Sequence, residues 1–163
     1  MKYCFLTLIL VTLNTDIIIG QVPAQIIPDF EFSRLDHSTF TNKDLPQDKM
    51  LFFVFFDSDC DHCQHAMKNI DARYLSFKKT KIFLISLDDN AKIKHFVNTY
   101  APHLKDQKNV FLLRDSLNQF ITKFKPYKYP SMFLYSAERK LIDYEDNEET
   151  VFRFVNTINK AIK

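Results

Sequence analysis

The sequence predicts a single α/β domain with a central mixed β-sheet and helices on both faces. Short apolar runs at residues 50–56, 81–87 and 110–113 alternate with amphipathic helical patterns, which is typical of parallel strands covered by helices. Two further strand-like runs, 132–135 and 141–144, are separated by only five residues, the length of a hairpin loop. The sheet therefore combines parallel and antiparallel pairs.

Composition supports one compact domain and excludes several function classes. The 163 residues are 46% hydrophobic and include 17 Phe and 7 Tyr, enough to fill one core with bulky rings. The formal net charge is only +2, and no block of like charge suggests a nucleic-acid partner. The single glycine, Gly20, leaves no Gly-rich phosphate loop, so we expect no cofactor.

The N-terminus predicts export. Lys2 precedes an apolar run of about ten residues, the pattern of a secretory signal peptide, which we place at residues 1–21. Asp16 interrupts the apolar stretch, so a retained membrane anchor is the alternative, and only an anchored chain would contact the membrane. Cleavage near Gly20 or Ala24 would remove Cys4 and leave a single domain at residues 22–163 in the periplasm or cell envelope.

The first elements of this domain form a predicted N-terminal β-hairpin extension. Residues 30–32 and 39–40 are strand-like, and 36–38 form a turn between them. The run at 50–56 is continuously apolar and too short for a buried helix, so it is predicted to be a central strand covered on both faces.

Helical periodicity predicts the elements between and after the strands. Apolar residues recur at helical intervals from Cys60 to Phe77, with Asp59 as a plausible N-cap. Similar patterns predict helices around residues 93–100 and 117–124. A terminal helix is predicted at residues 148–162, with Asn147 as its N-cap.

The segment Cys60-Asp61-His62-Cys63 joins the first central strand to its helix, and it predicts thiol–disulfide chemistry. Cysteines three apart on a helical turn share one face at a separation that suits a Cys60–Cys63 disulfide. At the helix N-terminus the Cys60 thiolate is favoured, which makes Cys60 the expected nucleophile. Cys63 lies on the apolar side and is the expected resolving thiol.

Charged neighbours act on this pair in opposite directions. A protonated His62 would stabilise the Cys60 thiolate and make the disulfide more oxidising. Asp57, Asp59 and Asp61 would disfavour the thiolate by like-charge repulsion. The sequence therefore leaves the direction of electron flow open.

Four features in order carry a resemblance to a known family. They are Pro28-Asp29-Phe30 before the hairpin, the strand that runs into the cysteine pair, the alternation of strands and helices, and Tyr129-Pro130-Ser131 before the last hairpin. From Pro28 onward the chain resembles the thioredoxin superfamily, in particular exported oxidoreductases of the TlpA/ResA type and their AhpC/TSA redoxin relatives.

The resemblance implies a thioredoxin-like fold and a protein thiol–disulfide oxidoreductase. Its partners would be a cysteine-containing protein substrate and a redox partner protein. It also implies a cis Pro130 opposite the cysteines, which leaves the backbone of Tyr129 free to pair with a substrate strand. Two positions depart from the family pattern: Asp59 stands where an aromatic residue often precedes the first cysteine, and Val54 stands where an acidic or amide side chain is common.

Three alternatives remain beside this hypothesis. Cys60 and Cys63 could bind copper or another metal with His62 or His65. Zinc would need about four ligands, and we expect no metal site in this chain. A thiol peroxidase would need Thr or Ser three residues before the reactive cysteine, where this chain has Asp57. A static disulfide in a binding domain is the third alternative. We expect the other histidines to lie on the surface: His37, His95 and His103.

Overall fold

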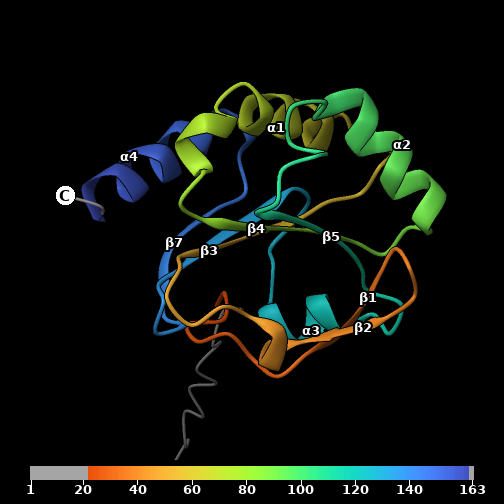
Figure 1. Ribbon diagram of the computed structural model, residues 1–163, viewed down its shortest axis with the longest axis horizontal. Coiled ribbons are helices and arrows are strands. Elements are labelled where there is room, and N and C mark those ends of the chain that lie inside the picture. The colour runs from red at the N-terminus through yellow and green to blue at the C-terminus, as the bar shows by residue number, and fades with distance from the viewer. Residues whose placement is uncertain (1–21, 162–163) are drawn as a thin grey trace, which may run out of the picture.

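The structure, a computed structural model, describes residues 22–161 and has the predicted α/β architecture. A seven-stranded mixed sheet carries α1, α2 and α4 on one face and α3 on the other (Figure 1). The helices are α1 Asp61–Asp71, α2 Asn90–Tyr100, α3 Gln119–Phe124 and α4 Val151–Ala161. The predicted signal peptide lies outside the described residues. Within 22–161, none of the helices is long and apolar enough to cross a bilayer.

The strand order is β2-β1-β5-β4-β3-β6-β7. The parallel pairs β5-β4-β3 form the middle, and both margins are antiparallel, including the predicted N-terminal hairpin of β1 and β2. This arrangement confirms the thioredoxin-like mixed sheet. The strands are β1 Glu31–Arg34, β2 Thr39–Thr41, β3 Leu51–Phe55, β4 Lys81–Ser86, β5 Val110–Arg114, β6 Ser131–Tyr135 and β7 Leu141–Glu145.

The central strand β3 is fully buried because both faces of the sheet are covered. Phe52 and Val54 lie in the core beneath α1, α2 and α4, whereas Phe53 and Phe55 lie in the core on the α3 side. The second core is a stack of rings that includes Phe120 on α3, 4.4 Å from Phe55 between ring centroids. The alternation of strand side chains thus divides one apolar run between two cores.

The helix after the cysteine pair differs from the prediction at both ends. Its N-cap is Cys60 and not Asp59, because the backbone of Cys60 is extended and its sulfur accepts the N–H of Cys63. The helix ends at Asp71, and a separate 3-10 turn, η2 at Tyr74–Phe77, follows. That turn stacks Phe77 on Phe52 with 5.1 Å between ring centroids.

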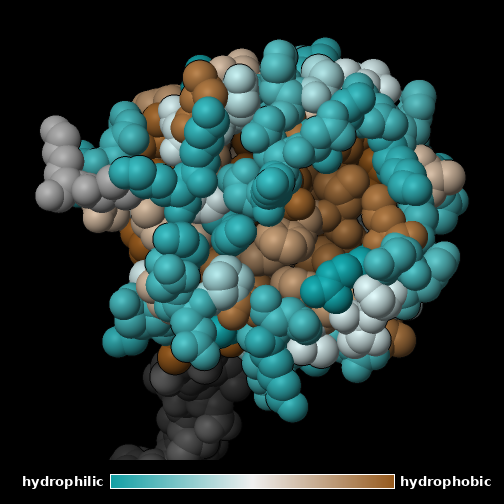
Figure 2. All heavy atoms as spheres, viewed as in Figure 1, coloured by the Kyte–Doolittle hydropathy of each residue, from teal (hydrophilic) through white to brown (hydrophobic). Residues whose placement is uncertain are grey.

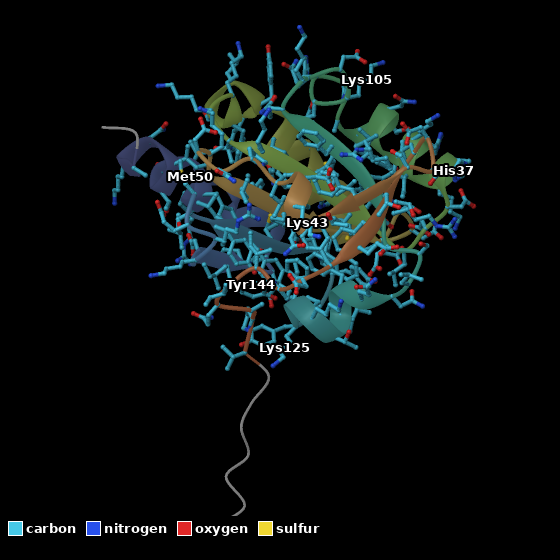
Figure 3. The ribbon with its side chains drawn as sticks, turned by 60° about the horizontal axis from the view of Figure 1, so that its bottom comes forward. His37, Lys43, Met50, Lys105, Lys125 and Tyr144 are labelled. Atoms are coloured by element: carbon cyan, nitrogen blue, oxygen red, sulfur yellow. The ribbon has the colours of Figure 1, made fainter. Side chains whose placement is uncertain are left out.

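With no glycine among the described residues, side-chain-bearing residues occupy the left-handed turns. His37 lies in the β1–β2 turn and Lys125 at the end of α3, both with positive φ (Figure 3). Asn118 and Arg139 do the same before α3 and in the β6–β7 loop. A residue with a side chain has a higher conformational free energy than glycine at positive φ. The packing around these turns therefore has to stabilise their backbone conformation.

The sheet is only partly covered over β5. Figure 2 shows apolar side chains in a hollow between α2 and the β1–β2 hairpin. Its volume is about 270 Å³, and Leu35, Val110 and Leu112 are among the residues that line it. All of β3 and all of β4 after Lys81 are buried, whereas most of β5 is half-buried, so the core is thinner toward this side of the sheet.

Candidate functional site

The candidate site lies where the carboxyl ends of β3 and β4 meet. The two strands are parallel, and Phe56 N–H donates to the Ile85 carbonyl. Beyond them, the backbone N–H and the hydroxyl of Ser58 donate to Asp88 Oδ2 at 3.0 and 2.7 Å. Burial alone would raise the pKa of Asp88, but the hydrogen bonds from Ser58 and Ser86 hold it below its ordinary value. These bonds fix the loop that leads into the cysteine pair.

Cys60 occupies the N-cap position of α1 and is partly exposed. The Cys63 N–H donates to Cys60 Sγ at 3.3 Å, so the sulfur already accepts a hydrogen bond from the first turn of the helix. A backbone N–H aimed at the sulfur, together with the positive end of the helix dipole, stabilises a thiolate. The geometry therefore suits an accessible sulfur nucleophile.

Cys63 has the opposite environment. Its side chain is 1% exposed and packs in the core beneath α1, with Cys60 and Tyr129 at the margin. Burial raises the pKa of the Cys63 thiol above its ordinary value, and the charges of Cys60 and Asp57 raise it further. Cys60 and Cys63 are free cysteines in the structure, and burial favours the protonated form of Cys63.

The loop before β6 brings Tyr129 and Pro130 to the same site. The Tyr129–Pro130 peptide is cis, the geometry that the resemblance implies. The Tyr129 ring lies 4.7 Å from the Phe55 ring and is half-buried. Burial raises the pKa of Tyr129 to about 12, with contributions from the charges of Asp57 and Cys63, so the phenol stays neutral beside the thiols.

Tyr144 on β7 anchors this loop. Its hydroxyl accepts the N–H of Tyr127 at 3.0 Å and lies 2.8 Å from the hydroxyl of Ser131. Ser131 in turn donates to the Lys128 carbonyl at 2.6 Å. One phenol thus fixes both sides of the Tyr129–Pro130 bond.

His62 is turned toward Glu148. Its Nδ1 lies 2.6 Å from Glu148 Oε1, in the 3-10 turn η3, Glu148–Thr150, before α4. This bond lowers the pKa of Glu148. Asn69 on α1 also donates to the Glu148 carbonyl, which holds the turn against the helix. The imidazole therefore has a carboxylate partner of its own that the sequence prediction did not include.

The three aspartates differ in how their charge is balanced. Asp59 Oδ2 lies 2.8 Å from Lys92 Nζ on α2, and this contact raises the pKa of Lys92. Asp57 accepts the N–H of Asp59, and its charge acts on Cys63 and Tyr129. Asp61 lies exposed in the first turn of α1. The acidic loop is therefore partly neutralised on its α2 side.

The structure brings Cys60, Cys63, Tyr129 and Pro130 together and places His62 at the margin. Sequence reasoning missed Glu148, Lys92 and Tyr144, which come from distant segments. Asp88 could have been found, because parallel neighbours β3 and β4 end at the same edge of the sheet. Nothing local in the sequence links Glu148 to His62, 86 positions away.

The remaining ionisable groups give little support to a metal centre. Within residues 22–161, no three His, Cys, Asp or Glu side chains are grouped to hold an ion. His65 and His95 are exposed, and His103 Nδ1 lies 2.7 Å from Asp71, far along α1 from the cysteines. Val54 is buried in β3, so no carboxylate occupies that position beneath Cys63.

Comparisons with known proteins agree with this geometry. Residues 23–144 match the model of the AhpC/TSA family. Among solved structures, a secreted Mycobacterium tuberculosis disulfide oxidoreductase homologous to E. coli DsbE is 16% identical, with a TM-score of 0.63 over 78% of this chain and 95% of that one.

Two other structures show how widely the fold is shared. The peroxidoxin BcpB from Mycobacterium tuberculosis is 15% identical, with a TM-score of 0.68 over 86% of this chain and 97% of that one. A SCO1/SenC family lipoprotein from Bacillus anthracis is 18% identical, with a TM-score of 0.66 over 86% and 98%. No curated protein sequence matches significantly. These identities support the fold alone.

Proposed function

The chain belongs to the AhpC/TSA family and is a thioredoxin-like redox protein, and we propose that it is a thiol–disulfide oxidoreductase acting on protein disulfides. The observation that carries the proposal is the contrast within the cysteine pair. Cys60 is partly exposed at a helix N-terminus with an N–H on its sulfur, whereas Cys63 is buried and its pKa is raised. Cys60 is therefore placed to attack the substrate disulfide, and Cys63 to resolve the mixed disulfide afterwards.

The chemistry needs only the two thiols and a substrate disulfide. The Cys60 thiolate attacks one substrate sulfur, forms a mixed disulfide and releases the other sulfur as a thiolate. Cys63 then loses its proton and attacks Cys60 Sγ, which forms the Cys60–Cys63 disulfide and releases the second substrate thiolate. Two electrons pass from the cysteine pair to the substrate. A dithiol partner protein then reduces the Cys60–Cys63 disulfide again. In the opposite direction the same steps oxidise a substrate dithiol.

The surrounding residues have supporting roles in this proposal. Tyr129 and the cis Pro130 lie beside the thiols, where the substrate backbone would pair. The charge of the Asp57 carboxylate raises the pKa of Cys63, so Asp57 lies close enough to be the candidate that accepts the Cys63 proton. Export to the periplasm or cell envelope, where disulfides persist, completes the proposal.

Two rival functions have less support. A copper or other metal carrier would need a third ligand grouped with the cysteines, and the described residues form no such group. A peroxidase would need a hydroxyl three residues before Cys60, where Asp57 stands.

The test is the equilibrium of the purified domain with a glutathione series, read by thiol trapping at each cysteine. We expect a single two-electron transition at Cys60 and Cys63. A midpoint of about −120 mV would make the protein a disulfide donor, and one of about −270 mV would make it a reductase. Failure of Cys60→Ser to abolish reduction of insulin, or a stoichiometric copper or zinc complex of the reduced protein, would contradict the proposal.

A further inference from the structure

Tyr144 on β7 completes a chain of three hydrogen bonds across the loop that precedes β6. The Ser131 hydroxyl donates its only proton to the Lys128 carbonyl at 2.6 Å. Ser131 Oγ therefore accepts a proton from the Tyr144 hydroxyl, 2.8 Å away. The Tyr144 oxygen in turn accepts the Tyr127 N–H at 3.0 Å. Each donor and acceptor in this hydroxyl chain is thus determined.

The hydroxyl chain encloses the part of the loop that the proposed function assigns to the substrate. It contacts the loop backbone at residues 127 and 128, and it contacts β6 at Ser131. Tyr129 and Pro130 lie between these points. The Tyr129 ring is held separately against Phe55, with 4.7 Å between ring centroids. The hydroxyl chain therefore acts on the loop backbone, which is the part that would pair with a substrate strand.

Tyr144 is itself held firmly on the sheet. Its register on β7 pairs it with Phe133 on β6, and its ring packs edge to face against the Phe133 ring with 4.8 Å between centroids. Ser131 is fully buried. Burial raises the pKa of the Tyr144 phenol, so the hydroxyl keeps the proton that it donates. Two hydroxyls with fixed partners on the sheet form a rigid support for the loop.

We propose that Tyr144 is a positioning residue for substrate binding, whose hydroxyl holds the backbone around Tyr129 in the conformation that pairs with an extended protein substrate. This inference rests on the proposed oxidoreductase function. A loop that is ordered before the substrate arrives loses less entropy when the substrate binds. Cys60 Sγ accepts its hydrogen bond from Cys63 and takes no part in the hydroxyl chain. The hydroxyl should therefore affect the affinity for protein substrates and leave the reactivity of Cys60 unchanged.

The test compares a protein disulfide with a small one. Tyr144→Phe keeps the ring and removes only the hydroxyl. We expect the KM for reduction of insulin to rise about fivefold with kcat unchanged, because the net contribution of one hydrogen bond corresponds to about this factor in binding. Reaction with hydroxyethyl disulfide, which has no peptide backbone to pair, should keep its rate. Iodoacetamide labelling of Cys60 and the midpoint with glutathione should also stay unchanged.

Tyr135→Phe is the matched control, because it removes a phenol hydroxyl from the neighbouring strand β6. That hydroxyl donates to the Ala24 carbonyl at 2.9 Å, and Tyr135 is fully buried on the same side of the sheet as Tyr144. Tyr135→Phe should lower the stability measured by urea unfolding and leave the KM for insulin unchanged. The comparison separates loss of a buried hydrogen bond from loss of the loop support.

Ser131→Ala tests the hydroxyl chain from its other member. It removes the group that links Tyr144 to the Lys128 carbonyl, so it should raise the KM for insulin in the same direction. The double variant with Tyr144→Phe should raise the KM no further than the larger single effect, because both hydroxyls act through one chain. Independent, multiplying effects of the two substitutions would contradict the coupling.

The remaining outcomes distinguish the role of Tyr144 from the function beneath it. An unchanged KM in Tyr144→Phe, or a KM raised as much by Tyr135→Phe, would overturn the positioning role while the oxidoreductase proposal stands. Equal slowing of the insulin and hydroxyethyl disulfide reactions would also overturn it, because the hydroxyl would then act on the thiols. A wild-type protein that reduces no insulin and shows no transition with glutathione would overturn the oxidoreductase proposal, and the role of Tyr144 with it.

Discussion

The two cysteines of the pair lie in opposite environments, one at the charged surface and one in the apolar core. On the outer side, Cys60 lies among exposed polar and charged groups, two of which have partners of their own: His62 with Glu148, and Asp59 with Lys92. On the inner side, Cys63 is in the apolar core, where burial raises its pKa. Charges in water have weak, screened effects, whereas burial acts strongly and independently of salt. Burial in the core therefore determines that Cys60 reacts before Cys63, and the surface charges adjust the reactivity of Cys60.

The largest effect should come from removing either thiol. Cys60→Ser and Cys63→Ser should each reduce turnover on protein disulfides by at least about 1000-fold, because neither step has a substitute. The two variants differ in what accumulates. Cys63→Ser should retain substrate as a mixed disulfide visible by non-reducing electrophoresis, and Cys60→Ser should retain none. Trapping by Cys60→Ser would reverse the assignment of nucleophile and resolving thiol.

The burial of Cys63 should also appear in the pH dependence of stability. Its pKa is raised in the folded state above the ordinary value of 9.0, so the unfolded chain releases this proton first as pH rises. The contribution to stability is complete below about pH 9 and is lost above it, at up to about 1.4 kcal/mol per pH unit. Urea unfolding of the reduced protein between pH 8 and 10 measures this slope.

The control for that slope is Cys63→Ala, which removes the titrating thiol. Its stability should fall less steeply across the same interval. The buried tyrosines contribute little below about pH 9.5, because the ordinary tyrosine pKa is about 10 and the unfolded chain also keeps these phenols protonated there. Identical slopes for the two proteins would show that Cys63 ionises as readily in the folded as in the unfolded chain.

Glu148 tests the outer side. In a measurement at pH 5.5, Glu148→Gln should leave a protonated His62 without its carboxylate partner. The unbalanced positive charge favours the Cys60 thiolate, so alkylation of Cys60 should become about two- to fivefold faster. Mass-spectrometric rates of iodoacetamide labelling report this directly.

The neighbouring carboxylate provides a matched control for Glu148. Glu149→Gln makes the same charge change one residue away on an exposed side chain and should alter the rate less. In the His62→Ala background, Glu148→Gln should lose most of its effect. A slower reaction in Glu148→Gln would mean that the carboxylate helps the thiolate by holding His62 in place.

The inner side could be predicted from the sequence far better than the outer side. The apolar run at 50–56 and the helical spacing of apolar residues after Cys60 predicted that Cys63 lies in the core. Burial along a strand or a helix can be recognised in the sequence, because it follows the regular spacing of apolar residues. The partners of His62 and Asp59 could not be predicted, because Glu148 and Lys92 reach the site only through tertiary packing of η3 and α2. The N-cap was misplaced for the same reason: Asp59 is drawn to Lys92, and the sulfur of Cys60 takes the capping position.

Lys92 should give the smallest effect. Lys92→Gln leaves Asp59 unpaired next to Cys60, and the unbalanced negative charge disfavours the thiolate. Because both side chains are at least half-exposed, solvent and salt screen the change, and Cys60 labelling at pH 6.5 should slow by only about two- to threefold. Lys94→Gln, an equal charge change on an exposed side chain of the same helix, should slow it less. In 1 M salt, where the screening length is about 3 Å, the difference between the two variants should disappear. A difference that persists in high salt would show that Lys92 acts by shaping the loop before Cys60, and the outer side would then be as rigidly built as the inner one.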